Sequence, residues 1–150
     1  MDNNLKWQAI DHFEPYEFDD PDVPGSGIEI DGHLLFDLNR LRRATGWPII
    51  PHWEVGGCID VNGNHGHAKK SYHRLDQGAK AVDFHFDTKV NPRTQCLEVE
   101  KMGFPGVGFY YDWHWDGKKL KIGFHVDRRA RLKAQRWTRR NGNYLYWWKA

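Results

Sequence analysis

The chain has 150 residues, of which 39% are hydrophobic, 28% charged and 15% aromatic. This composition is typical of one globular domain with a sizeable core, spanning residues 1–150, and it excludes a disordered or low-complexity chain. The net charge of +2 hides an asymmetry, because acidic residues gather before residue 32 and basic residues gather after residue 117. The basic end is either a solvated surface or a surface that attracts an anionic polymer, such as cell wall or nucleic acid.

Targeting segments and a disulfide framework are not expected. No run of about 18 or more apolar residues is present, so we expect no membrane partner. The first four residues lack the basic and apolar regions of a secretory signal, so we expect synthesis in the cytoplasm without a signal peptide. Cys58 and Cys96 are too few for a disulfide framework and have no second cysteine at metal-ligand spacing, so we expect free, mostly buried thiols.

The first part of the chain predicts one helix and one strand. Residues 1–28 are interrupted by proline and glycine and predict an irregular, acidic segment. Leucines at helical spacing predict a helix over 31–45, which Asp31 can cap. Residues 47–51 predict a short strand. The glycine-rich residues 54–70 predict a long loop, and such loops are often functional.

Alternating side chains dominate the rest of the chain. Residues 79–86 predict a strand with one polar face and one mostly apolar face. A helix is expected over 92–102, and further strands over 106–111 and 119–129. Residues 136–148 predict a hairpin about an Asn-Gly turn. This order predicts an α+β fold, with a small, mostly antiparallel sheet and two or so helices packed on one side.

Two imidazoles and a carboxylate are candidates for a metal site. Asp83 and His125 lie on the polar faces of their predicted strands, where small neighbours leave room for a cleft. Together with His73 they form a ligand set that suits zinc with one open position. Zinc in such a site lowers the pKa of a bound water to about 7, which makes the water a nucleophile. From spacing alone, this set could be coincidental, since a chain with nine histidines contains many such combinations. The pair His65 and His67 is an alternative pair of metal ligands.

Three motifs carry these residues, namely Ser71-Tyr-His73, Gly78-Ala-Lys-Ala-Val-Asp83 and Gly123-Phe-His125-Val-Asp127. They resemble the zinc D-Ala-D-Ala carboxypeptidase group, which includes phage L-alanyl-D-glutamate endopeptidases and shares its fold with the hedgehog signalling domain. The resemblance extends to the segments 12–18, 106–110 and 136–144 and so covers most of the chain. It implies a hedgehog-like fold, zinc bound by His73, Asp83 and His125, and a substrate in the stem peptide of peptidoglycan.

The chain departs from that group at three places. Asp83 follows His73 by ten positions, where common members have a gap of seven, and the extra residues fall in a turn. Residues 50–54 contain no arginine, whereas many members use one there to hold a substrate carboxylate, so an endopeptidase is favoured over a carboxypeptidase. Ile122 stands where many members carry an acidic residue, three positions before the last histidine.

The general base must therefore come from another position. Asp127 is the first candidate, because its side chain leaves the strand on the same face as His125. Its alternative role is to hold a ligand in place or to pair with a neighbouring arginine. Asp112 and His114, in the preceding turn, are the other candidates, and His85 could orient a ligand.

The leading hypothesis is a monomeric zinc peptidase that hydrolyses the peptide part of bacterial peptidoglycan. Such an enzyme would be a phage or prophage lysin-type endopeptidase, or a carboxypeptidase, that acts on the wall after release or as part of a phage particle. The alternative is a non-catalytic, zinc-stabilised module that binds cell wall or protein. A nucleic-acid binder is not expected, because no recognisable nucleic-acid-binding motif accompanies the basic residues.

Overall fold

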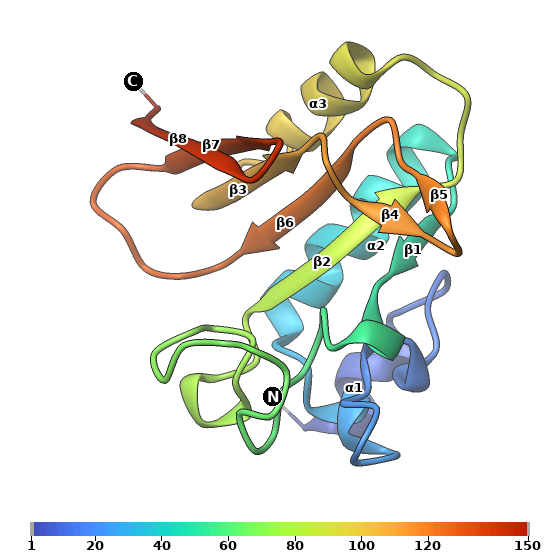
Figure 1. The fold of residues 1–150 in the computed structure, drawn as a ribbon. Helices are drawn as coiled ribbons and strands as arrows, with labels where there is room; N and C mark the ends of the chain where they lie inside the picture. Colours follow the sequence, from blue (N-terminus) through green and yellow to red (C-terminus); the bar gives the residue numbers. More distant parts are fainter. Residues whose placement is uncertain (1, 150) are drawn as a thin grey trace.

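The computed structural model describes residues 2–149 and has an α+β architecture. The α-helices in this range are α1 (Asn3–Gln8), α2 (Gly32–Thr45) and α3 (Pro92–Glu100). Short 3₁₀ turns are η1 (Pro15–Phe18), η2 (Ser26–Glu29), η3 (Trp53–Val55) and η4 (Leu75–Gln77). The strands of the main sheet are β1 (Ile49–Pro51), β2 (Ala81–Phe86), β3 (Gly106–Tyr110), β6 (Gly123–Asp127), β7 (Gln135–Arg140) and β8 (Asn143–Trp148). A separate small hairpin pairs β4 (His114–Trp115) with β5 (Lys118–Lys119) (Figure 1).

The main sheet is mixed. Its six strands run in the order β1-β2-β6-β3-β7-β8, and β3 and β7 are parallel while the other neighbouring pairs are antiparallel. A parallel pair needs a long connection, and here the chain between β3 and β7 supplies the β4–β5 hairpin and β6. The predicted α+β class is confirmed, with a six-stranded mixed sheet and three α-helices where two or so were expected.

Helix α2 follows directly from its sequence. The Asp31 carboxylate accepts a hydrogen bond of 3.0 Å from the backbone N–H of Leu34, which satisfies one of the free donors at the helix start. The helix ends at Gly46, whose φ of 71° is the left-handed conformation that glycine adopts most readily. Between these ends, its four leucines are completely buried against the sheet, as the spacing predicts (Leu34, Leu35, Leu38 and Leu41).

The prediction of an irregular N-terminal segment is wrong for residues 3–8, which form α1. The Asp2 carboxylate caps this helix by accepting a hydrogen bond of 2.7 Å from Asn4 N–H. Lys6 is buried and donates a 2.6 Å hydrogen bond from its Nζ to the carbonyl of Ile30. Helix α1 is thus held by tertiary contacts, which a six-residue stretch cannot reveal through hydrophobic periodicity.

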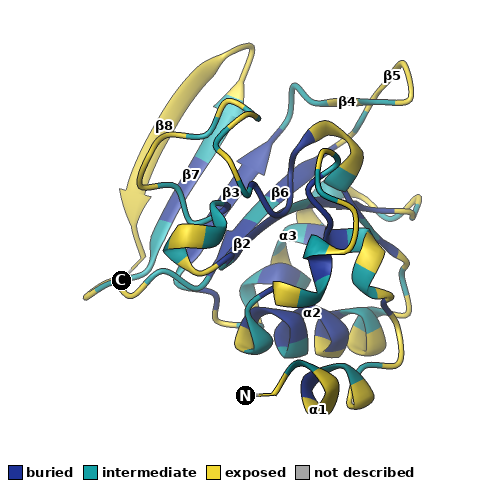
Figure 2. Ribbon diagram, turned by 90° about the horizontal axis from the view of Figure 1, so that it is seen from below, coloured by how far each residue is buried: buried dark blue, intermediate teal, exposed yellow. Residues whose placement is uncertain are grey.

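The two faces of the sheet have different roles. One face carries fully buried apolar side chains, including Val82, Phe84 and Phe124, and packs against α2 and α3 (Figure 1 and Figure 2). The opposite face carries the polar and small residues of the same strands. Strand β2 begins at Ala81 rather than at residue 79, because Ala79 has a φ of 50° and turns the chain.

The strand expected over 119–129 is divided. The chain pairs in the small hairpin at Lys118–Lys119, leaves it, and joins the main sheet only at Gly123. The N–H of Leu120 donates to the carbonyl of Trp113 at 2.9 Å, which holds the departing chain against the hairpin. The alternation of side chains continues through the break, so the sequence pattern alone did not indicate it.

The final hairpin is confirmed. Asn141 and Gly142 have φ values of 50° and 78°, the two positive values that a tight hairpin turn of this kind requires. Strands β7 and β8 pair from Gln135↔Trp148 to Arg140↔Asn143 on either side of this turn. Within residues 2–149, no helix is both long and apolar enough to cross a lipid bilayer.

Candidate metal site

The polar face of the sheet brings together His73, Asp83 and His125. Asp83 in β2 and His125 in β6 are direct cross-strand partners, so their side chains leave the sheet on the same side. His73 arrives from the loop before η4. The carbonyl of His73 accepts from Asp60 N–H at 3.0 Å, which anchors this loop beside the sheet.

Their donor atoms have the spacing that a tetrahedral ion requires. His125 Nδ1 lies 2.9 Å from Asp83 Oδ1, and His73 Nε2 lies 3.3 Å from each of these two atoms. Metal–ligand bonds of about 2.0–2.1 Å in a tetrahedral arrangement separate neighbouring donors by about 3.3 Å. The three atoms thus form one face of a tetrahedron that zinc fits, and the described residues supply no fourth protein donor to it.

The second ring nitrogen of His73 and of His125 also has a hydrogen-bond partner. Nδ1 of His73 lies 3.0 Å from the carbonyl oxygen of Cys58, and Nε2 of His125 lies 2.9 Å from Oδ2 of Asp127. An acceptor on the far nitrogen fixes the ring orientation and leaves the other nitrogen's lone pair for a metal. Both rings therefore have the support that metal-binding histidines usually have.

The electrostatics of the protein groups favour a cation at this position. Burial opposes the charge on Asp83, but the neighbouring His73 and the hydrogen bond with His125 hold the pKa of this carboxyl well below its usual range. Burial likewise opposes a charged His125, yet its hydrogen bonds with Asp127 and Asp83 raise the pKa of this ring to about 9. The site therefore presents a carboxylate ready to bind a cation and a proton that the cation must displace.

Two cavities share Asp83 and His67 among their lining residues, and a third, smaller one of about 170 Å³ is lined by His125 and Asp127. The first has a volume of about 330 Å³ and extends from the triad to the β7–β8 hairpin. The second has a volume of about 240 Å³ and extends toward η3 and the segment that leads into β4.

Glycines allow aromatic side chains to lie flat on this face of the sheet. A Cβ atom at Gly108 would clash with the indole nitrogen of Trp137, and one at Gly123 would clash with the ring of Trp113. The indole N–H of Trp137 donates to the hydroxyl of Tyr110 at 3.0 Å. Tyr110 in turn stacks on Trp113 with ring centroids 4.0 Å apart. The room that the sequence leaves beside His125 is therefore filled by rings.

Asp127, the first candidate for the general base, lies behind the triad. Its Oδ2 contacts the far nitrogen of His125, and its Oδ1 accepts from Arg131 Nη1 at 2.7 Å and from Arg129 N–H at 3.1 Å. Asp127 is buried and lines neither of the two larger cavities, but it lines the smaller one together with His125 and Arg131. Both of its oxygens are already occupied by hydrogen bonds with His125, Arg131 and the N–H of Arg129, which is the pattern of a residue that orients a ligand.

Asp112 and His114 are separated from one another. The Asp112 carboxylate accepts from Gly142 N–H at 2.7 Å and pairs with Arg139, so it stabilises the final hairpin turn. His114 is exposed on β4 and lines the second cavity together with Asp83. Of these two candidates, only His114 shares a cavity with the triad.

The sequence interpretation missed a dyad formed by Asp60 and His67. The Asp60 carboxylate is fully buried, accepts from Gly63 N–H at 2.7 Å, and contacts Nδ1 of His67 at 3.0 Å. The ring of His67 stacks on that of His73, with centroids 4.2 Å apart and planes at 14°. Burial and the neighbouring His73 lower the pKa of His67. The sequence does contain a turn signal at this place, since Asp60 stands three residues before Gly63, but a turn signal does not identify the partner of the carboxylate.

A second imidazole pair lies on the other side of Asp83. Nε2 of His52 and Nδ1 of His85 are 2.8 Å apart, and the His52 ring stacks on Trp115 at 4.4 Å between centroids. Burial lowers the pKa of His52 to about 4, so this ring is neutral at physiological pH. His52 therefore lines the second cavity as a neutral ring.

His65, the partner of His67 in the rival pair, belongs to a different cluster. Its Nε2 lies 2.8 Å from Oδ1 of the buried Asp20 and 3.3 Å from Asp22. Asp20 also accepts from Val61 N–H at 2.8 Å, so these contacts attach the long loop to the N-terminal segment. His65 and His67 thus hold the loop through two separate carboxylates.

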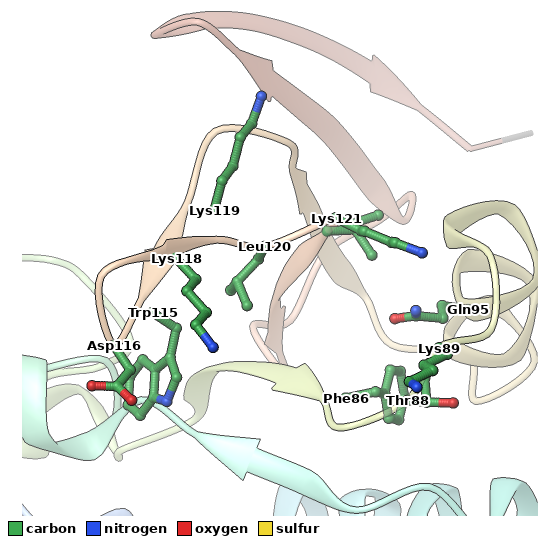
Figure 3. Close-up of a pocket in the computed structure, with 11 residues that line it drawn as sticks. Phe86, Thr88, Lys89, Gln95, Trp115, Asp116, Lys118, Lys119, Leu120 and Lys121 are labelled. Atoms are coloured by element: carbon green, nitrogen blue, oxygen red, sulfur yellow. The ribbon is translucent and has the colours of Figure 1, made fainter.

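Another pocket, of about 350 Å³, lies between the segment around β5 and the start of α3 (Figure 3). Phe86, Leu120 and Ile122 contribute apolar side chains, and four lysines surround them (Lys89, Lys118, Lys119 and Lys121). No histidine or cysteine lines this pocket. This pocket therefore offers no imidazole or thiolate ligand for a metal ion.

Comparison of the chain with protein-family models, with curated proteins and with solved structures finds no match in any of the three. The resemblance of the histidine and aspartate motifs to zinc D-Ala-D-Ala peptidases therefore stays a prediction. The geometry described above stands independently of it, since it comes from the distances between the side chains of this chain.

Proposed function

We propose that the protein is a zinc-dependent peptidase that hydrolyses the peptide part of bacterial peptidoglycan. The observation that carries this proposal is the tetrahedral spacing of the donors from His73, Asp83 and His125, together with the support on the far nitrogen of each histidine. When bound, zinc supplies a Lewis acid that polarises a carbonyl and lowers the pKa of a water to about 7. The choice of stem peptide as substrate rests on the resemblance of the motifs around these residues.

His67 is the side chain best placed to move a proton in such a reaction. Its ring faces both cavities and lies against His73, and its Nδ1 is held by the buried carboxylate of Asp60. With the Nδ1 hydrogen donated to Asp60, Nε2 is left as a proton acceptor. A base that is oriented by a third group is a recurring arrangement in hydrolytic sites. His114 is the second candidate for this role.

The cellular setting is part of the proposal. Basic residues in the second half of the chain would keep the enzyme on anionic wall material. We propose a monomeric lysin-type endopeptidase of a phage or prophage, made in the cytoplasm and acting on the wall after release or as part of a phage particle. A carboxypeptidase of the same chemistry is the related possibility.

One observation favours a second candidate function, a zinc-stabilised binding module without catalysis. Asp83 is the only carboxylate that lines the two larger cavities, and the carboxylate of Asp127, in the smaller cavity, is held by His125 and Arg131. As a metal ligand, Asp83 is not available as a general base, so catalysis in the proposed site depends on an imidazole. If neither His67 nor His114 transfers a proton, the same site would bind zinc and cell wall or protein without cleaving it.

Hydrolysis of purified peptidoglycan tests the proposal directly. The protein is assayed after zinc loading, after treatment with a chelator, and after zinc is restored, and newly exposed amino groups are labelled and identified. We expect new amino termini only in the zinc-containing samples, and the identity of the labelled residue reports which bond is cleaved. Stoichiometric zinc without new amino termini would favour the binding module, and cleavage that is insensitive to the chelator would contradict the zinc mechanism.

Three variants assign the roles. His73→Ala should lose both zinc and activity, whereas His67→Gln should keep zinc and lose about 10²–10⁴-fold in kcat, the usual contribution of a proton-transfer group. His33→Ala is the matched control, because His33 is exposed on α2 and contacts Arg128 on the opposite side of the sheet from the triad. It should leave zinc content and activity unchanged.

A further inference from the structure

Strand β8 exposes an unusual amount of aromatic surface. All six of its residues are exposed, and Figure 2 shows it as a continuous exposed strand at the edge of the sheet. The exposed fractions of Tyr144 and Tyr146 are 49% and 56%, and those of Trp147 and Trp148 are 40% and 59%. Exposed aromatic clusters of this kind on a folded domain mark binding surfaces more often than they serve stability.

One face of β8 is continuous with the candidate metal site. The sheet register aligns Asp83, His125, Gly108, Trp137 and Tyr146 as successive neighbours across five strands. These side chains therefore leave the sheet on the same side, with the metal ligands at one end of the row and Tyr146 at the other. Tyr144 and Tyr146 line the same cavity of about 330 Å³ as the triad.

The rings on this face form a shelf, which we define as Trp137, Tyr144 and Tyr146. The two tyrosine rings are nearly parallel, with planes at 12° and centroids 5.7 Å apart. Trp137 lies between Tyr146 and His125, with ring centroids 6.0 Å and 5.2 Å from theirs. The hydrogen bond from Trp137 to Tyr110 and the Arg139 guanidinium 5.5 Å from the Tyr144 ring hold the shelf in position.

This arrangement suits pyranose rings. A sugar ring presents an apolar C–H face that stacks on an aromatic ring, while its hydroxyl and amide groups reach outward to polar partners. Tyrosine and tryptophan provide such a flat apolar face with a polar group at the rim. A second copy of the chain is a less suitable occupant, because a copy seated on the shelf would cover the cavity that contains the triad.

We propose that the shelf binds the glycan strand of peptidoglycan and so presents the attached peptide to the triad. This inference rests on the proposed function for the identity of the polymer. In the bound state, a sugar ring stacks on Tyr144 and Tyr146, and the peptide that branches from it passes Trp137 toward His125. The shelf is thus a binding subsite for the sugar part of the substrate, distinct from the atoms that react.

The test measures binding without hydrolysis. Glycan strands are prepared from purified peptidoglycan with an amidase that removes the peptides, and their affinity for the zinc-loaded protein is measured by calorimetry. The double variant Tyr144→Ala/Tyr146→Ala should bind at least about tenfold more weakly than the wild type, as expected for the loss of aromatic stacking. Leu145→Ala is the matched control, because Leu145 lies on the same strand, is 66% exposed and points to the opposite face. It should bind as the wild type does.

A second measurement does not depend on the folding of any variant. In the wild-type protein, the indole N–H resonance of Trp137 should shift when peptide-free glycan is added, because this group lies within the shelf. With a cleavable substrate, the double variant should raise KM for glycan-linked peptide more than it raises KM for free peptide.

The outcomes separate this inference from the proposed function. Glycan binding that depends on the tyrosines, without cleavage of any peptide, would support the glycan-binding shelf and contradict the proposed peptidase activity. Cleavage of peptide with no glycan binding, or equal loss in Leu145→Ala and the double variant, overturns the shelf alone. A dimer in light scattering that the double variant dissociates would also overturn it, since the shelf would then be a contact between copies.

Discussion

Replacing Asp127 with asparagine separates the two roles that this residue could have. In the structure its carboxylate accepts hydrogen bonds on both oxygens, from His125 on one and from Arg131 and the Arg129 N–H on the other. An asparagine side chain has one oxygen and one NH₂ group, and the NH₂ group cannot accept. Whichever way the amide turns, either His125 or the arginine side loses its acceptor.

The expected magnitude follows from this loss. Removing the group that orients a metal-binding histidine typically costs 10–100-fold in metal affinity. A tenfold change corresponds to about 1.4 kcal/mol, so the Asp127→Asn variant should bind zinc about 1.4–2.8 kcal/mol more weakly. When zinc is supplied in excess, its kcat should fall by less than the roughly 100-fold minimum expected for a lost proton-transfer group.

Competition with a zinc-binding dye measures the affinity, and peptidoglycan hydrolysis at saturating zinc measures kcat. Asp112→Asn is the matched control, because Asp112 makes the same kinds of contact to the final hairpin turn and should leave zinc affinity unchanged. Unchanged zinc affinity in Asp127→Asn, combined with a kcat loss of more than about 100-fold, would refute this reasoning and make Asp127 the general base.

Three further predictions test other parts of the account. Burial opposes a charged His125, but Asp127 and Asp83 raise the pKa of this ring to about 9, so zinc must displace a proton from it below that pH. Zinc affinity, measured with a competing dye, should therefore rise about tenfold per pH unit and level off above about pH 9. A constant affinity between pH 6 and 8 would contradict this. Gly108→Ala should destabilise the protein by about 1–3 kcal/mol in urea unfolding, since the new Cβ clashes with Trp137, and an unchanged midpoint would argue against the close packing there. Leu38→Ala should cost about 2–5 kcal/mol, because Leu38 is fully buried, yet the folded variant should retain its zinc.

The elements that local sequence determines were predicted well. Helix α2 carries its own cap at Asp31, its own stop at Gly46 and four leucines at helical spacing, so all the information lies within the segment. The β7–β8 hairpin likewise depends on Asn141 and Gly142, which select the turn. Such elements need no knowledge of the rest of the chain.

The features that depend on distant contacts were missed. Helix α1 is held by the hydrogen bond from Lys6 to Ile30, and the strand break before Gly123 depends on packing with Trp113. The parallel pairing of β3 with β7 joins two strands whose local sequences do not identify one another as partners. Each of these requires the folded structure, because the residues that cause them are remote in sequence.

The candidate site likewise combines features that local sequence indicates with features that depend on distant contacts. The donor atoms of His73, Asp83 and His125 lie close together because β2 and β6 pair with Asp83 opposite His125, and their role as zinc ligands stays a prediction. The Asp60–His67 dyad was not anticipated, because a glycine-rich loop has no periodicity from which a side-chain direction can be read. The position of Asp127 also needed the structure, since strand alternation gives its face but not its partners.

X-ray absorption at the zinc edge of the zinc-loaded protein tests whether His73, Asp83 and His125 bind the ion. We expect one zinc per chain, bound by two imidazole nitrogens and by oxygen ligands at about 2.0–2.1 Å. The same spectrum should be absent from an Asp83→Ala sample at equal protein and zinc concentration. A sulfur ligand at about 2.3 Å, or a wild-type protein that retains no stoichiometric zinc, would contradict the claim that these three side chains form a zinc site.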